Sequence, residues 1–334
     1  MINDEKNTFP RIVADIGGTN ARFALEISPY NYEFIKVLDC KEYSTVAAAV
    51  TAYLDDINMQ NKVKHAAIAV PSPMVNDVLF MVNSPWHGQL MSETKKNLNI
   101  ENIIFLNDFH ALALSIPHIK QDNLIQCGGT EAPNPNKPIA IIGPGTGLGM
   151  ATLIRHPLGD YLAIPAEGGR SSFAPTNEEE LELWKFARSK FKHVSVERFL
   201  CGPGLQLIHK GLCHIHGEDT HATPTPAQIT LRGINKTDSI CTHTINIFCH
   251  MLGTVASNLA TMVNAFGGVY IGGGIIPKMV DYFLHSEFRK NFEAKGRYHE
   301  HLAKIPVYII MDTFAAFLGA SYAIDTYINK GFIP

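Results

Sequence analysis

Two glycine-rich turns of similar sequence could bind phosphate groups: GGTN at 17–20 and GPGTGLG at 143–149. Each is preceded and followed by an apolar, strand-like run, and aligning Gly18 with Gly145 gives an offset of 145 − 18 = 127 residues. Glycine has no Cβ, so its backbone N–H can approach phosphate oxygens closely. A third glycine cluster, at 272–274, also follows a strand-like run. Together these segments favour a cradle for a triphosphate over three unrelated tight turns.

Two common nucleotide-binding motifs do not fit the sequence. It contains no GxxxxGK[ST], which argues against a P-loop NTPase. GPGTGLG does not satisfy GxGxxG, because the third glycine would fall on Leu148 or Met150. The turn is also followed by an apolar strand-like run, so a dinucleotide-dependent oxidoreductase is disfavoured.

Asp15 stands at the end of the strand-like run before the first turn. There its carboxylate would face the same phosphates, and the two negative groups repel each other unless a cation lies between them. We therefore predict that Asp15 binds Mg²⁺, through water. The alternative is that Asp15 hydrogen-bonds the backbone of its own turn.

An amide and a carboxylate, Asn107 and Asp108, follow directly on the apolar run 103–106. Apolar spacing then resumes, as in an amphipathic helix. A strand that ends in Asn-Asp before such a helix can place both side chains at the mouth of a cleft. The alternative is structural, because asparagine and aspartate are also common helix N-caps.

The elements that would position these residues alternate between strands and helices, which indicates an α/β fold. At 334 residues the chain is long enough for two lobes, and the loop at 128–138 is a plausible boundary between them. If the two hairpins are related, the fold is duplicated. We predict strands or hairpins at 11–27, 65–70, 103–107, 139–154, 267–277 and 305–311. We predict helices at 91–100, 177–191, 195–200, 204–212, 226–233, 239–264 and 315–328.

Composition restricts the partners. A net charge of −3 provides no field for nucleic acid or for an anionic membrane. The stretch 239–277 has no charged residue, but its large apolar side chains recur every three to four positions, which favours a buried helix over a membrane span.

No signal peptide is evident, and the six cysteines lack CxxC spacing, so we expect reduced thiols and a cytoplasmic location. The histidines of the loop 214–227 have no carboxylate or thiolate at ligand spacing, which disfavours a metal site there.

The whole chain resembles the bacterial glucokinases of the proteobacterial type, within the actin-like sugar kinase superfamily. The matching segments, in order, are VADIGGTNARFAL, LNDFHALALSIP, IGPGTGLGMATL, PAEGGRSSFAP, HVSVERFLCGPGL and GGVYIGGGIIP. The resemblance implies a two-lobed, actin-like (ribonuclease H-like) ATPase fold with a cleft between the lobes. We expect a smaller α/β domain of residues 1–118 plus 312–334 and a larger one of residues 119–311. It also implies ATP and Mg²⁺ as cofactors and a homodimer.

The resemblance assigns roles to individual residues. Asp108 matches the catalytic base that takes the proton of the sugar 6-hydroxyl, and Asn107 matches a residue that hydrogen-bonds the sugar. Glu167 and Glu197 match two further sugar-binding carboxylates, and Asn83, in NSPW, is a weaker candidate of the same kind. The residues that match the nucleotide-binding segments are Ala14, Asp15, Ile16, Gly17, Gly18, Thr19, Asn20, Gly143, Gly145, Thr146, Gly147, Gly272, Gly273 and Gly274.

One position departs from the family pattern. After EGG the family usually has a histidine that touches the sugar, whereas this sequence has Arg170. Arginine only donates hydrogen bonds and stays charged, so it cannot replace an imidazole acceptor. It could donate to a sugar hydroxyl, pair with Glu167 or Glu197, or point away from the sugar.

The expected activity is phosphorylation of D-glucose at the 6-hydroxyl by ATP. The alternatives are a kinase for another hexose, such as mannose, fructose or glucosamine, and a non-catalytic sugar or ATP sensor. A sensor would not need a base at Asp108.

Overall fold

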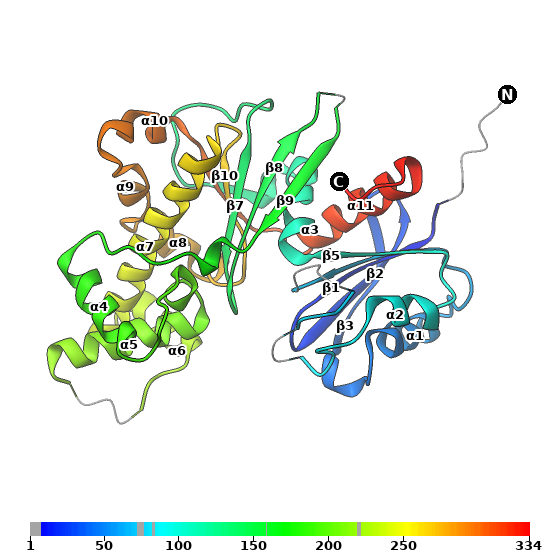
Figure 1. The fold of residues 1–334 in the computed structure, drawn as a ribbon, viewed down its shortest axis with the longest axis horizontal. Coiled ribbons are helices and arrows are strands. Elements are labelled where there is room, and N and C mark those ends of the chain that lie inside the picture. Colours follow the sequence, from blue (N-terminus) through cyan, green and yellow to red (C-terminus); the bar gives the residue numbers. More distant parts are fainter. Residues whose placement is uncertain (1–7, 72–76, 82–83, 158, 219–221) are drawn as a thin grey trace. The chain divides into compact units, whose positions relative to one another are not determined.

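The computed structural model describes residues 8–71, 77–81, 84–157, 159–218 and 222–334. The chain forms two compact units (Figure 1). Unit 1 comprises residues 1–120, 160–163 and 312–334, and unit 2 comprises residues 121–159 and 164–311. Compared with the boundaries expected from the sequence, unit 1 gains residues 119–120 and 160–163. The loop at 128–138 lies inside unit 2, so its interpretation as a boundary between lobes was wrong.

Unit 1 is built on a five-stranded sheet with the order β3-β2-β1-β4-β5. The central strands are parallel: β1 pairs with β4, and β4 with β5. The antiparallel partners β2 and β3 complete the other edge. The strands are β1 (Arg11–Ile16), β2 (Asn20–Ser28), β3 (Asn31–Asp39), β4 (His65–Val70) and β5 (Asn102–Asn107).

Helices cover both faces of this sheet (Figure 1). The helices are α1 (Val46–Asp56), α2 (Met91–Asn97), α3 (Asp108–Ser115) and α11 (Ala315–Lys330). Alternate residues of β1, such as Ile12 and Ala14, join the apolar core with α1. On the other face α11 packs closely on α3: a Cβ built on Gly319 would lie 1.7 Å from the carbonyl oxygen of Ala111. Only glycine permits this approach.

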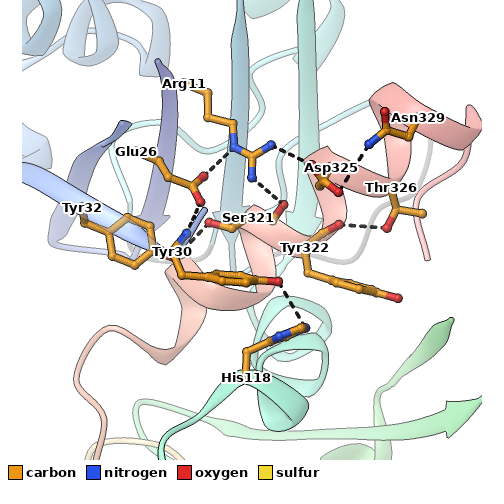
Figure 2. A network of polar contacts seen from close by, with 10 residues as sticks. All are labelled: Arg11, Glu26, Tyr30, Tyr32, His118, Ser321, Tyr322, Asp325, Thr326 and Asn329. Carbon is orange, nitrogen blue, oxygen red and sulfur yellow. Dashed lines mark hydrogen bonds and ion pairs between the residues drawn. The ribbon is translucent and has the colours of Figure 1, made fainter. Parts of the chain in front are cut away.

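A buried polar network fastens β1 and β2 to α11 (Figure 2). The Arg11 guanidinium lies 2.5 Å from the carboxylate of Glu26, and both side chains are almost fully buried. Arg11 also donates to the carbonyl oxygen of Ser321, and the hydroxyl of Tyr32 bonds to the Ser321 side chain. This network orders unit 1 and does not include the predicted site residues.

Unit 2 is built on a six-stranded sheet with the order β6-β11-β10-β7-β8-β9. The strands are β6 (Leu124–Gln126), β7 (Ile139–Pro144), β8 (Leu148–Arg155), β9 (Tyr161–Ala166), β10 (Val269–Ile271) and β11 (Val307–Ile310). The helices are α4 (Glu178–Arg188), α5 (Gly202–His216), α6 (Pro226–Ile234), α7 (Ser239–Val263), α8 (Val280–Leu284), α9 (Phe288–Glu293) and α10 (His299–Lys304).

The long helix α7 is the centre of the helical layer of unit 2. It packs on α5, α6, α9 and β7, and much of its surface, including Ile245, Phe248 and Leu252, is fully buried. The predicted buried helix is therefore confirmed. Among the described residues no helix is both long and apolar enough to cross a membrane.

The two sheets share one topology. The order β3-β2-β1-β4-β5 of unit 1 matches β9-β8-β7-β10-β11 of unit 2, with β6 added beyond β11. In each unit a glycine turn joins the two strands of an antiparallel hairpin. The first strand of the hairpin pairs in parallel with a further strand, which in turn pairs in parallel with the next: β1 with β4 and β4 with β5, or β7 with β10 and β10 with β11. This correspondence supports the duplication predicted from the two turns.

Short 3-10 turns join these elements in the described parts of the chain: η1 (Cys40–Glu42), η2 (Ile116–His118), η3 (Gln121–Asn123), η4 (Gly168–Arg170), η5 (Val196–Arg198), η6 (Ile276–Met279) and η7 (Gly296–Tyr298). The predicted helix at 195–200 is only the turn η5. All six cysteines are buried and unbridged.

Candidate active site

One edge of the unit 1 sheet collects the predicted acidic residues. Asp15 lies opposite Ala69 of β4, and Ala69 lies opposite Leu106 of β5. Since the three strands are parallel, their carboxyl ends meet at the same edge, with neighbouring strands about 4.8 Å apart. The first glycine turn begins directly after β1. Asp15, this turn and the pair Asn107–Asp108 therefore share one edge.

Asn107 is the N-cap of α3. Its Oδ1 accepts hydrogen bonds from the backbone N–H of Phe109 (2.9 Å) and of His110 (3.2 Å). The structural alternative proposed for this pair thus holds for Asn107. The cap also has a consequence for the site, because it fixes where the helix begins and so where its first residue stands.

Asp108 is the first residue of α3, and its Oδ1 accepts from the backbone N–H of Phe109 at 2.8 Å. This hydrogen bond fixes one oxygen of the carboxylate. A general base must be held within hydrogen-bond reach of the proton that it removes.

Asp15 has a partner that the sequence analysis did not identify. Its Oδ2 lies 3.3 Å from the guanidinium of Arg22, which stands opposite it on β2. Burial raises the pKa of Asp15, and the neighbouring positive charge of Arg22 opposes that rise. In the part of the chain that the structure describes, Asp15 thus pairs with a side chain of the adjacent strand rather than with its own turn. The signal was available in the register of a tight hairpin, where residues 15 and 22 face each other.

The donor set at this edge fits a magnesium ion held largely by phosphates and water. Mg²⁺ prefers oxygen ligands and is commonly bound by one or two carboxylates plus substrate phosphates. The described residues contain no cluster of three or more His, Cys, Asp or Glu side chains that could hold a metal unaided. One carboxylate, that of Asp15, beside the first glycine turn is compatible with such an ion.

The first glycine turn is closed by a hydrogen bond from the Gly17 N–H to the Asn20 carbonyl oxygen (2.8 Å). Ala14 and Ile16 are fully buried within β1. These two residues could therefore contribute to nucleotide binding only through the backbone. Thr19 and Asn20 are exposed at the turn.

In unit 2 the second turn and the third glycine cluster are packed together. The turn is closed by a hydrogen bond from the Gly145 N–H to the Gly147 carbonyl oxygen (2.8 Å). The Gly272 N–H donates to the Ile142 carbonyl oxygen, and a Cβ on Gly273 would lie 2.4 Å from the Pro144 carbonyl oxygen. Gly273 also has φ +79°, which favours glycine. The second turn and the cluster at 272–274 are therefore neighbours within this unit, and their role in binding phosphate stays a prediction.

The predicted sugar-binding carboxylates of unit 2 lie beside that turn. Glu167 precedes η4, and Glu197 lies within η5. The two segments are joined by a hydrogen bond from the Val196 N–H to the Ser171 carbonyl oxygen. Arg170 connects the acids: its Nη1 is 2.8 Å from Glu197 and its Nε is 3.9 Å from Glu167. Of the two pairings considered for Arg170, the one with Glu197 is the closer.

The candidate residues therefore form two groups. Unit 1 brings together Asn107, Asp108, Asp15 and the first turn, and unit 2 brings together Glu167, Arg170, Glu197 and the other glycines. Asn83 lies outside the described residues.

The duplicated sheet, the paired glycine turns and the acids at strand ends define an actin-like sugar kinase fold. The chain belongs to the glucokinase family, whose model matches residues 12–327. It is 45% identical to the glucokinase of Neisseria gonorrhoeae over 322 residues, or 96% of this chain and 97% of that one. It is 41% identical to the glucokinase of Campylobacter jejuni, covering 99% of this chain and 98% of that one.

Solved structures support the same family. A glucokinase from an Antarctic psychrotroph superposes with a TM-score of 0.83 at 30% identity, covering 94% of this chain and 98% of that one. A ROK family glucokinase from Streptomyces griseus, solved with glucose and AMPPNP, has a TM-score of 0.64 at 15% identity over 95% of this chain and 99% of that one. At that identity the second match indicates the fold alone.

Proposed function

We propose that this protein transfers the γ-phosphoryl group of ATP to the 6-hydroxyl of D-glucose, with Asp108 as the general base. The observation that carries the proposal is the place of Asp108. It is the first residue of α3, directly after the Asn107 cap, at the sheet edge that also carries Asp15 and the first glycine turn. Membership of the glucokinase family supplies the substrates.

Asp108 would accept the proton of the 6-hydroxyl as that oxygen attacks the γ-phosphorus. A positioned base contributes about 10²–10⁴-fold to such a reaction. Most of the remaining acceleration in phosphoryl transfer comes from in-line placement and from neutralised charge. The backbone N–H groups of the glycine turns would supply part of that charge. Mg²⁺, when bound at Asp15, would neutralise the phosphate oxygens.

Asn107, Glu167, Glu197 and Arg170 would bind the sugar hydroxyls, as the sequence analysis expects. Side chains of this kind discriminate strongly, because a sugar that lacks one hydroxyl leaves a polar group without its partner. The proposed reaction needs residues of both units to act on the same two substrates. The cleft expected from the sequence stays a prediction.

A second candidate, a kinase for another hexose, is favoured by one observation. Arg170 pairs with Glu197 at 2.8 Å, so one carboxylate expected to bind sugar already has a cationic partner. This pairing could change which ring hydroxyls are accepted. The family also leads us to propose that the protein is a homodimer and is located in the cytoplasm. Size-exclusion chromatography with light scattering would test the oligomeric state.

The deciding experiment is an ADP-forming coupled assay on glucose, mannose, fructose and glucosamine, with wild-type enzyme and Asp108→Asn. Glucose should give the highest kcat/KM, and Asp108→Asn should lower kcat by about 10²-fold or more with little change in glucose affinity. Asp122→Asn, at an exposed position outside the site, is the matched control. Absence of sugar-dependent ADP release would overturn the kinase, and full activity of Asp108→Asn would overturn the base.

A further inference from the structure

Glu197 touches both the second glycine turn and Arg170. Its Oε2 accepts a hydrogen bond from the backbone N–H of Leu148, the first residue of β8, at 2.9 Å. Its Oε1 accepts from Nη1 of Arg170 at 2.8 Å. Glu197 is 22% exposed and Arg170 is 66% exposed. One oxygen of the carboxylate is therefore bonded to the backbone, while the other is bonded to the exposed side chain of Arg170.

The turn is shaped around this carboxylate. A Cβ on Gly147 would lie 2.6 Å from Oε2 of Glu197, so no larger residue fits there without displacing the acid. A Cβ on Gly169 would lie 2.5 Å from the carbonyl oxygen of Leu148. On the far side of the turn, the Gly202 N–H donates to the Gly145 carbonyl oxygen at 2.8 Å. The turn and the segments that carry Arg170 and Glu197 are thus packed as one block.

We propose that Glu197 is a positioning residue that couples the sugar to the second phosphate-binding turn, and that Arg170 holds its outer oxygen until a sugar hydroxyl arrives. This inference rests on the proposed function. A carboxylate oxygen can accept a hydrogen bond from a sugar hydroxyl in place of the one from a guanidinium group. Because the other oxygen is bonded to the Leu148 N–H, a change at the sugar end alters the geometry of the turn that cradles phosphate.

The consequence is a thermodynamic coupling between the two substrates. A sugar that changes the turn must change nucleotide affinity, and by reciprocity the nucleotide must change sugar affinity by the same factor. A simple sugar contact predicts otherwise: loss of Arg170 would weaken sugar binding and leave the coupling factor unchanged. The coupling factor is therefore the quantity that separates a positioning role from a contact.

The test is calorimetric titration of Mg-AMPPNP with and without saturating glucose, on wild-type protein, Arg170→Met and Arg170→Lys. In the wild type, glucose should tighten AMPPNP binding by about fivefold or more. Arg170→Met should bring that factor close to one, because Glu197 then has no guanidinium donor to release. Without glucose this variant should bind AMPPNP about as tightly as the wild type does with glucose. Arg170→Lys retains the charge and should restore part of the coupling. Arg188→Met removes an exposed arginine that bonds only a nearby carbonyl oxygen in the described structure, and is the control.

A second pair of variants tests the bridge from the other end. Gly147→Ala adds a methyl group that collides with the Glu197 carboxylate, so it should weaken glucose binding by about tenfold even without nucleotide. Gly202→Ala is the control beside the same turn, because Gly202 is not a predicted site residue and the nearest atom to its Cβ would lie at an ordinary contact distance of 3.6 Å. It should leave nucleotide-free glucose binding within about twofold of wild type.

Wild-type coupling in Arg170→Met would overturn the role of Arg170, and unchanged glucose binding in Gly147→Ala would overturn the bridge. No coupling in the wild type would overturn both. Failure of the proposed function would look different, since wild-type protein would then neither bind glucose nor release ADP in its presence.

Discussion

The carboxylate of Asp15 and the guanidinium of Arg22 face each other across the β1–β2 hairpin, 3.3 Å apart. Asp15 is the only carboxylate proposed to bind Mg²⁺, and such a ligand must be ionised. Burial raises its pKa, and the positive charge of Arg22 counteracts that rise. Arg22 should therefore keep Asp15 ionised, and so able to bind Mg²⁺, at lower pH. Arg22 was not among the residues expected from the sequence.

We predict that Arg22→Leu raises the pKa of Asp15 further, because the opposing positive charge is lost. The acid limb of kcat/KM for Mg-ATP should then move to higher pH, with the largest loss of activity on the acidic side. Arg22→Lys preserves the charge and should keep the limb near its wild-type position. The measurement is kcat/KM for Mg-ATP as a function of pH for the three proteins. Coincident acid limbs for Arg22→Leu and wild type would contradict the prediction.

The strands that carry the two turns could be predicted because their signals are local. Apolar runs end at glycine turns, and the duplicated order of the sheets follows from the similarity of those turns. Strand β3 gave no such signal, since most of its side chains are exposed and their polarity does not alternate. In α1 the run VAAAVTAYL is rich in alanine, which weakens the apolar periodicity although Thr45 caps the helix.

The contacts inside the site could not be predicted from local patterns. Glu197 and Leu148 are separated by 49 residues, and Arg170 and Glu197 by 27. No periodicity reports which oxygen of a carboxylate meets which backbone N–H. Asn107 shows the converse case: a local capping signal was correct, but it did not exclude a second role beside Asp108.

Asn107 allows the capping role and the sugar-binding role to be separated. Asn107→Ala loses the bonds to the Phe109 and His110 N–H groups and should cost about 0.5–2 kcal/mol of stability. Asn107→Ser keeps an N-cap acceptor of similar strength but loses the amide, so it should be nearly as stable as wild type. If the amide binds sugar, both variants should lose glucose affinity.

Urea unfolding and glucose titration on the same samples measure the two roles. A serine variant with wild-type glucose affinity would show that Asn107 acts as a cap and not as a sugar ligand. A serine variant as unstable as the alanine variant would contradict the cap.

The Arg11–Glu26 pair should make a large contribution that depends on both partners being present (Figure 2). Arg11→Met leaves the Glu26 carboxylate buried without its cation and should cost about 3–5 kcal/mol. In the wild type the Tyr30 N–H donates to Glu26 at 2.8 Å. The double variant Arg11→Met with Glu26→Gln removes the buried charge and keeps an acceptor for this N–H. The double variant should therefore unfold at higher urea concentration than the single one.

Lys36→Met is the control for that experiment, because Lys36 pairs with Asp56 at the surface. Exposed ion pairs contribute about 0–1 kcal/mol. The interpretation fails if Arg11→Met is no more destabilising than Lys36→Met.

Glu180 should make the stability of unit 2 depend on pH. It is 2% exposed and bonds His250 at 2.8 Å, and its other oxygen accepts from the N–H and hydroxyl of Thr176. Burial alone would raise the pKa of Glu180, but these hydrogen bonds outweigh it and the pKa is lowered from the ordinary value of 4.5. A carboxyl group whose pKa is lowered by folding stabilises the fold at pH values above its unfolded-state pKa. That stabilisation is lost as the pH falls through the folded-state pKa.

We therefore predict that Glu180→Gln is less stable than wild type at neutral pH, and that the gap in unfolding free energy narrows as pH falls below about 4.5. Glu182→Gln, on the same helix, removes an exposed acid paired with Lys185 and should show a small gap at every pH. Urea midpoints between about pH 3 and pH 7 measure both gaps. A Glu180→Gln gap that stays constant across that range would mean that the ionised form of Glu180 is not preferentially stabilised by folding.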